Sequence, residues 1–467
     1  MTATLRQRLQ QLGGLAVASA GAPRPTGGAA AGAGPGPWGR DAHAWAGAGF
    51  TEEAPGLLVR RTRVPLAADG PLLASSLALL AGDPRWAEPG GDAVWLFDVE
   101  TTGLAGGTGT VPFLYGWARL DGLVPGGGCA GATRAGLEVE QWLLPELGCE
   151  EPLVRAAVAR LRGARGIVTY NGRTFDLPLV RTRAILARVP GPWPAPPHLD
   201  LLPPTRRLFR HRLERCTLAS ASAALVGTQR GADLPGREVP ERYRSYLRGG
   251  DPAALGPVLD HNVADLAELG GLLHRLAGHV EGGGGEPRDA YGLGRFYEAR
   301  GRAEAALQSY GTAVALAPPP LDRAALGRRA RLLRRQGRLG EAASLWEVGW
   351  RRWGDMEAAE ALAVDREWRC RDLEGALALS RAALVRAPDP WAPRFARRIW
   401  RLERRLGRSR GPEGVRPDPV RPAPWASWLP GGVSYEAWQL LHGRRSSRAT
   451  TAARPGRWGA GTAAAGR

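Results

Sequence analysis

The fold of this 467-residue chain is decided by one stretch, VWLFDVETTGL at residues 94–104. Its four apolar residues and the acids that follow predict a buried central strand, in which a carboxylate needs a partner or a metal ion to offset its lost hydration. Because side chains two residues apart on a strand share a face, Asp98 and Glu100 are expected to point toward one ion. An isolated Asp-x-Glu pair is more often part of a solvated turn, so the interpretation depends on further motifs.

A loop of small residues, 101–109, follows this strand. Small side chains and glycines allow the backbone of a substrate to approach the protein closely. We therefore predict that Thr101, Gly103 and Leu104 contact a substrate.

The second motif, YNGRTFDLP at residues 170–178, joins a short apolar strand to a helix. Asn171 and Gly172 indicate a tight turn that exposes backbone amides at the strand end, where sites of α/β proteins lie. Asp176 falls in the first helical turn, where the helix dipole favours a carboxylate, so capping explains it equally well when it is taken alone. Phe175 either fills the core or stacks on a base. Asn171 and Phe175 are predicted substrate contacts.

The third motif, HNVADL at residues 261–266, lies within a pattern of apolar residues at helical spacing. The separation of four places His261 and Asp265 on one helix face. An exposed polar helix residue is the simpler interpretation of His261 in isolation. Asp200, at the end of another short predicted strand, is interpreted as a structural residue in preference to an additional acid near the site.

Together, these motifs predict one site with four carboxylates, and repulsion forbids such a cluster unless divalent cations occupy it. Hard oxygen ligands favour Mg²⁺ or Mn²⁺ over zinc, and a pair of ions suits displacement at a phosphodiester. His261 titrates near neutral pH and is the predicted general base for an attacking water. The predicted ligands of the two ions are Asp98, Glu100, Asp176 and Asp265.

The composition indicates an anionic partner and no membrane. The net charge is +18, and all 63 basic residues are Arg, which also fits a GC-rich coding bias. Most of the excess lies in the C-terminal half, where attraction of phosphates and a simple solvated surface explain it equally well. The four cysteines have no paired spacing, so they predict neither disulfides nor zinc. Neither a spanning segment nor a secretory signal is evident, and a cytoplasmic location is expected.

The order of the predicted elements indicates a mixed sheet with helices on its faces. Strands are expected at 94–100, 111–120, 137–144, 167–170 and 198–202, and the main helices at 152–162, 174–187 and 255–276. A short strand at 57–59 and a helix at 72–80 are expected to pack on this domain.

The motifs DVETTGL, YNGRTFDLPLV and HNVADL, in this order, resemble those of the DEDD superfamily of RNase H-like 3′→5′ exonucleases. The surrounding segments HLDLLPPTRRLF, CTLASAS and DLPGREVPERYRSYL narrow the resemblance, over about residues 90–275, to the bacterial YprB-type ribonuclease H-like family. The resemblance implies an α/β RNase H-like fold, the four acids as metal ligands and His261 at the position of the base. His261 precedes Asp265 by four residues, as the tyrosine does in the Tyr-type branch, rather than by five as in the His-type enzymes.

A second domain with a different periodicity follows the glycines at 282–285. Residues from Leu293 to Pro318 have the spacing of a tetratricopeptide repeat, and looser copies follow 36 and then 34 residues later. The resemblance implies an all-α helical-repeat domain that binds a peptide. Because this domain is rich in arginine, a nucleic-acid backbone is the alternative partner. The simplest interpretation of these arginines is that they cover a solvated helix face.

The sequence therefore predicts five segments. These are a flexible leader (1–45), an N-terminal extension (46–90), an RNase H-like exonuclease domain (91–280), tetratricopeptide-like repeats (286–408) and a largely disordered tail (409–467) with a short helix at 435–441. The predicted function is a nuclease that removes nucleoside 5′-monophosphates from single-stranded 3′ ends. An endonuclease with the same site and a non-catalytic adaptor built on the repeats are the alternatives.

Overall fold

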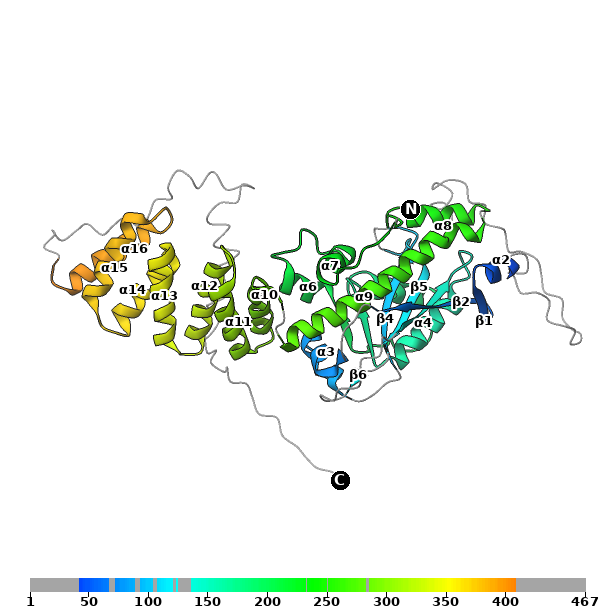
Figure 1. Cartoon of the computed structure of the whole chain (residues 1–467), viewed down its shortest axis with the longest axis horizontal. Helices are drawn as coiled ribbons and strands as arrows, with labels where there is room; N and C mark the ends of the chain where they lie inside the picture. Colours follow the sequence, from blue (N-terminus) through cyan, green and yellow to red (C-terminus); the bar gives the residue numbers. More distant parts are fainter. Residues whose placement is uncertain are drawn as a thin grey trace, which may run out of the picture. The chain divides into compact units, whose positions relative to one another are not determined.

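The computed structural model describes residues 42–66, 72–88, 93–103, 107–120, 123–124, 136–231, 233–249, 251–282 and 285–408. They form two compact units that divide between Ala325 and Leu326, and Figure 1 labels their helices and strands. The tail, with its predicted short helix, lies outside the described residues, as does most of the predicted leader. Residues 42–45 of that leader begin helix α2 (Ala42–Gly47), in which Trp45 is buried against Phe50 and Tyr246.

The first unit contains a seven-stranded mixed sheet in the order β1-β2-β7-β5-β4-β8-β9, which confirms the predicted fold class. Neighbouring strands are antiparallel from β1 to β4, whereas β4, β8 and β9 are parallel. The strands are β1 (Phe50–Ala54), β2 (Leu57–Pro65), β4 (Val94–Thr101), β5 (Pro112–Leu120), β7 (Gly136–Leu143), β8 (Gly166–Thr169) and β9 (His198–Asp200). A separate pair joins β3 (Leu72–Leu73) to β6 (Leu123–Val124). The N-terminal extension thus does more than pack on the domain, because β1 and β2 extend its sheet.

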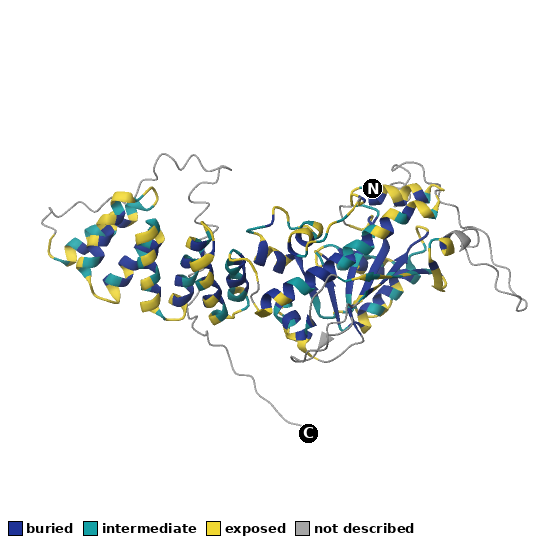
Figure 2. Cartoon of the chain, viewed as in Figure 1, coloured by how far each residue is buried: buried dark blue, intermediate teal, exposed yellow. Residues whose placement is uncertain are grey.

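Strand β4 separates two hydrophobic cores, and its alternation decides which side chains face each of them. Leu96 lies in the core beneath helix α9 (Gly256–Gly282), whereas Phe97 lies in the opposite core and packs on Trp117 at a ring distance of 4.2 Å. Figure 2 shows the sheet as the largely buried centre of this unit. Asp98 and Glu100 follow Leu96 at steps of two, so both belong to the face that α9 covers.

Helices lie on both faces of the sheet, as predicted. The opposite core includes residues of α4 (Glu151–Gly163), α5 (Asp176–Leu186) and α8 (Val239–Leu247). The core beneath α9 includes residues of α3 (Ala74–Ala81), α6 (Leu202–Phe209) and α7 (Leu218–Leu225). None of the described helices, α9 included, combines the length and apolarity needed to cross a bilayer.

The C-terminal region is all-helical, as predicted. In order, its helices are α10 (Asp289–Ala299), α11 (Ala303–Leu316), α12 (Leu321–Arg335), α13 (Leu339–Trp353), α14 (Met356–Trp368), α15 (Leu373–Arg386) and α16 (Ala392–Arg405). Close helix packing requires small residues, since a Cβ at Gly294 would lie 2.5 Å from the Tyr310 ring. Helices α10 and α11 belong to the unit of the sheet, and a Cβ at Gly292 would collide with the Leu208 carbonyl of α6.

We predict that His198 makes the first unit sensitive to acid. Its Nε2 lies 2.9 Å from Thr169 Oγ1, and burial lowers the pKa of His198 to about 4. The unfolded chain binds a proton at this residue below about pH 6.5, so the contribution of His198 to the free energy of unfolding should fall by up to about 2 kcal/mol from pH 7 to pH 5 and stay constant above pH 7. In urea unfolding, His198→Gln should lose this part of the pH dependence. Equal pH dependence in both proteins would contradict the prediction.

Candidate active site

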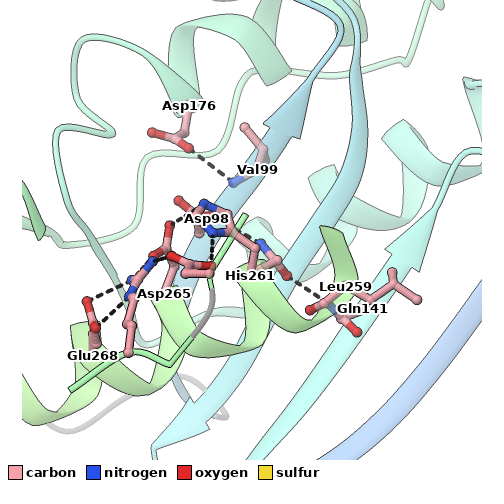
Figure 3. A network of polar contacts seen from close by, with 11 residues as sticks. Asp98, Val99, Gln141, Asp176, Leu259, His261, Asp265 and Glu268 are labelled. Atoms are coloured by element: carbon pink, nitrogen blue, oxygen red, sulfur yellow. Dashed lines mark hydrogen bonds and ion pairs between the residues drawn. The ribbon is translucent and has the colours of Figure 1, made fainter. Parts of the chain in front are cut away.

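The two acids of β4 lie on its α9-covered face, near the carboxyl end of the strand. Asp98 Oδ2 accepts a hydrogen bond from Asn262 Nδ2 at 2.9 Å (Figure 3). Glu100 forms a group with His261 and Asp265 of α9, in which one ligand atom of each lies within 4.8 Å of the others. The strand period and the helical spacing therefore bring four of the predicted site residues together.

Asp176 reaches the same site from the first turn of α5. Its Oδ1 accepts a hydrogen bond from the backbone amide of Val99 at 3.2 Å, so its carboxylate lies beside the strand between the two acids of β4. The chain enters α5 through a turn in which Asn171 has a φ of 68°. A Cβ on Gly172 would lie 2.5 Å from Thr169, which explains the glycine at this position.

Asp200 holds the turn before Asp176 in place. Its buried carboxylate accepts hydrogen bonds from the backbone amides of Asn171 at 2.8 Å, Arg173 at 3.1 Å and Leu202 at 3.0 Å. This is the structural role that the sequence favoured for Asp200. It also fixes the end of β8 against the end of β9, next to the site.

The electrostatics of the site favour a bound cation. Burial, followed by repulsion from Asp265, Asp176 and Glu100, raises the pKa of Asp98 well above its ordinary value. Burial also raises the pKa of Glu100 to about 8 and that of Asp176 to about 7. Carboxyl groups in this state hold protons near neutral pH and exchange them for a divalent cation. The residues present therefore fit a divalent metal held by oxygen ligands.

Three residues that the sequence analysis missed position Asp98. Gln141 of β7 donates from Nε2 to the Leu259 carbonyl at 2.8 Å and to Asn262 Oδ1 at 3.1 Å, which orients the amide that binds Asp98. Gly116 of β5 leaves the space for this amide, because a Cβ there would lie 2.3 Å from Asn262 Oδ1. Asn262 adjoins His261 in the third motif, but its burial depends on sheet packing.

The segment between α7 and α8 supplies two more missed residues. His261 Nδ1 donates to Asp233 Oδ1 at 2.7 Å, since a carboxylate offers only acceptors. The guanidinium of Arg230 contacts Asp265, binds Asp233 Oδ2 at 2.7 Å and binds Glu268 at 2.7 Å. His261 Nε2 and Asp265 Oδ2 are left facing each other at 3.8 Å. Asp233 opens the DLPGREVPERYRSYL segment, so the family resemblance offered a signal for it.

The predicted substrate-contacting residues differ in burial and in hydrogen bonding. Thr101 is buried and donates from Oγ1 to the Gly103 carbonyl at 2.7 Å, so its observed role is to hold the loop. Gly103 is partly buried, Asn171 is exposed, and Phe175 is partly buried at the residue before α5. Leu104 lies outside the described residues. Their contact with a substrate stays a prediction.

Comparison with known proteins agrees with this geometry. Residues 95–277 match the family model of the RNase_H superfamily, and this match spans strands β5, β7, β8 and β9 of the mixed sheet. The chain is also 31% identical over 258 residues to a Bacillus subtilis (strain 168) protein described as "Uncharacterized protein YprB". That match covers 54% of this chain and 59% of the relative, so the chain spans less than two thirds of the relative's length. The predicted YprB-type resemblance is confirmed, whereas the tetratricopeptide identity of the repeats stays a prediction.

Gly116→Ala is predicted to disturb the site without altering a polar group. The added Cβ displaces the Asn262 amide from Asp98, so the free energy of unfolding should fall by about 1–3 kcal/mol. The rise in melting temperature that Mn²⁺ gives the wild-type protein should shrink as well. Gly109→Ala is the matched control, because a Cβ there has no neighbour within 4 Å. If the two variants behave alike in a thermal shift assay with and without Mn²⁺, Gly116 has no such role.

Proposed function

We propose that this chain is a metal-dependent 3′→5′ exonuclease that acts on single-stranded nucleic acid and releases nucleoside 5′-monophosphates. The observation that supports the proposal is the convergence of four carboxylates and His261 on an RNase H-like sheet. Such a cluster is unstable without cations, and a domain that only binds does not require it. We propose two ions, Mg²⁺ or Mn²⁺, held by Asp98, Glu100, Asp176 and Asp265.

In this proposal, each protein group has a separate task. The bound ions supply Lewis-acid stabilisation of charge on the reacting oxygens. His261 takes the proton of the attacking water at Nε2, because Nδ1 is committed to Asp233. Although burial opposes the charged ring, Asp265, Asp233 and Glu100 raise the pKa of His261, which favours acceptance of a proton. Asn262 and Arg230 keep Asp98 and Asp265 in position.

Two alternatives remain within the proposal. An endonuclease would use the same residues, with a path for the strand to continue on both sides of the site. An adaptor would use the second unit, where Trp368 is 63% exposed beside a hollow of about 650 Å³ that Trp346 and Trp391 also line. This hollow is where we place a peptide partner of the repeats.

A cytoplasmic location is also part of the proposal.

Digestion of 3′- and 5′-labelled single-stranded DNA and RNA tests the function. With Mg²⁺ or Mn²⁺, we expect a ladder that shortens from the 3′ end and reveals the preferred sugar. Asp98→Ala should abolish cutting because a metal ligand is lost, and His261→Ala should slow it by about 10²–10⁴-fold because the base is lost. Internal fragments at the earliest times would favour the endonuclease. Binding of both polymers without any cutting would favour the adaptor.

Asp233→Asn tests the orientation of His261. The neutral amide supports the Nδ1–H tautomer less well, so kcat should fall by about 10–100-fold with little change in KM. The control is Asp260→Asn, the same substitution at the exposed neighbour of His261. Initial rates on a labelled oligonucleotide, measured across pH, give both constants. A change in KM alone, or an equal effect at Asp260, would rule out the positioning role.

A further inference from the structure

Four arginines surround a hollow on the first unit, which we call the arginine basin. Arg206, Arg207 and Arg210 come from α6 and the residue after it, and Arg295 comes from α10. Pro203, Cys216 and Thr217 complete the lining of a space of about 690 Å³. The three arginines of the α6 segment are exposed, whereas Leu208 and Phe209 of the same helix are buried in the core. The basin is therefore a surface feature, separate from the packing of α6.

The acidic residues that the structure describes do not pair with the arginines of the basin. No acidic side chain lines it, and among the described residues none of its four arginines forms an ion pair with a carboxylate. Three exposed arginines elsewhere in the same unit are paired with an acid. Arg61 contacts Glu53, Arg85 lies 2.7 Å from Asp83, and Arg155 contacts Glu151. The high Arg content of the chain explains why arginines are numerous. It does not explain why four of them lie together in a hollow that no acidic side chain lines.

Like charges also lie close together around the basin. Burial lowers the pKa of the Arg300 guanidinium at the end of α10, and the positive charge of Arg207 lowers this pKa further. Like-charge neighbours repel each other unless an anion lies between them. Guanidinium groups bind phosphate oxygens through two parallel hydrogen bonds, so phosphates are the anions that this chemistry suits best.

The helix that carries three of the basin's arginines, α6, begins at the edge of the sheet that holds the candidate active site. Strands β4, β8 and β9 are parallel, so their carboxyl ends lie at one edge, and α6 begins two residues after Asp200 at that edge. Tyr170, at the end of β8, donates from its hydroxyl to the Cys216 carbonyl in the basin at 2.7 Å. With about 1.5 Å of helix rise per residue, Arg206 lies roughly 6 Å and Arg210 roughly 12 Å from the start of α6.

We propose that the arginine basin binds the sugar–phosphate backbone of the nucleic-acid strand whose end occupies the active site. The proposal rests on the proposed function and names the path of its substrate. Charges spread along a helix suit successive phosphates of a polymer better than one small anion. The polymer is a nucleic acid rather than an acidic protein, because the basin adjoins the carboxyl edge of an RNase H-like sheet.

The test compares two triple variants of the full chain with equal loss of charge. One carries Arg206→Gln, Arg207→Gln and Arg210→Gln; the control carries Arg61→Gln, Arg85→Gln and Arg155→Gln, at paired positions whose side chains are 55%, 52% and 54% exposed. Affinity for labelled oligo-dT and oligo-U of about 20 nucleotides is measured in EDTA over a range of salt. Hydrolysis of bis(p-nitrophenyl) phosphate with Mn²⁺ reports on the active site without a polymer.

We expect the basin variant to bind the oligonucleotides at least about tenfold more weakly and to lose about 2 from the slope of log K against log salt, at about 0.7 per phosphate contact. Its hydrolysis of the small diester should equal that of the wild type, and the control should bind within about twofold of wild type. Equal binding by the two triple variants overturns the proposal. A loss of affinity for poly-glutamate without a loss for oligonucleotides also overturns it and assigns the basin to an acidic protein.

Failure of the proposed function gives a different result. The wild-type protein then hydrolyses neither the small diester nor an oligonucleotide with either metal. The binding comparison between the two triple variants still decides whether the basin holds a nucleic-acid backbone.

Discussion

The structure depends on the cost of keeping four carboxylates together at the end of β4. Burial and mutual repulsion raise the pKa values of Asp98, Glu100 and Asp176, so the cluster is stable only with protons or cations. Arg230 supplies one fixed positive charge at Asp265, on the edge of the cluster. One guanidinium balances only part of the negative charge. The negative charge that remains favours the binding of divalent cations.

Contacts from distant parts of the chain hold these carboxylates in position. Gln141 orients Asn262, and Asn262 in turn donates to Asp98, in a space that exists because residue 116 is a glycine. A buried polar network of this kind is strong when every member is satisfied and costly when one is missing. The site is therefore built into the sheet and α9, so its geometry and the stability of the unit depend on the same contacts.

The arginines divide into groups that the composition cannot separate. Arg160 stacks on Trp95 at 4.2 Å and binds Glu140 at 2.9 Å, so its charge serves the protein's own packing. Arg398 of α16 likewise lies 2.9 Å from the fully buried carboxylate of Glu367. Arg206 and Arg207 have no such partner among the described residues and remain exposed. The net charge of +18 therefore carries less information about binding than the position of the unpaired charges.

The sequence by itself determined the local geometry of the site and the class of the fold. The strand period put Asp98 and Glu100 on one face, and helical spacing did the same for His261 and Asp265, because both periods are local properties of the backbone. Only the tertiary structure decided which side chains meet. Strand order placed β1 and β2 in the sheet. Strand order and helix packing also produced the contact of Gln141 with Asn262 across 121 residues and the contact of Asp233 with His261. Such long-range pairings leave no periodic signal in the sequence, since they arise from the sum of many packing contacts.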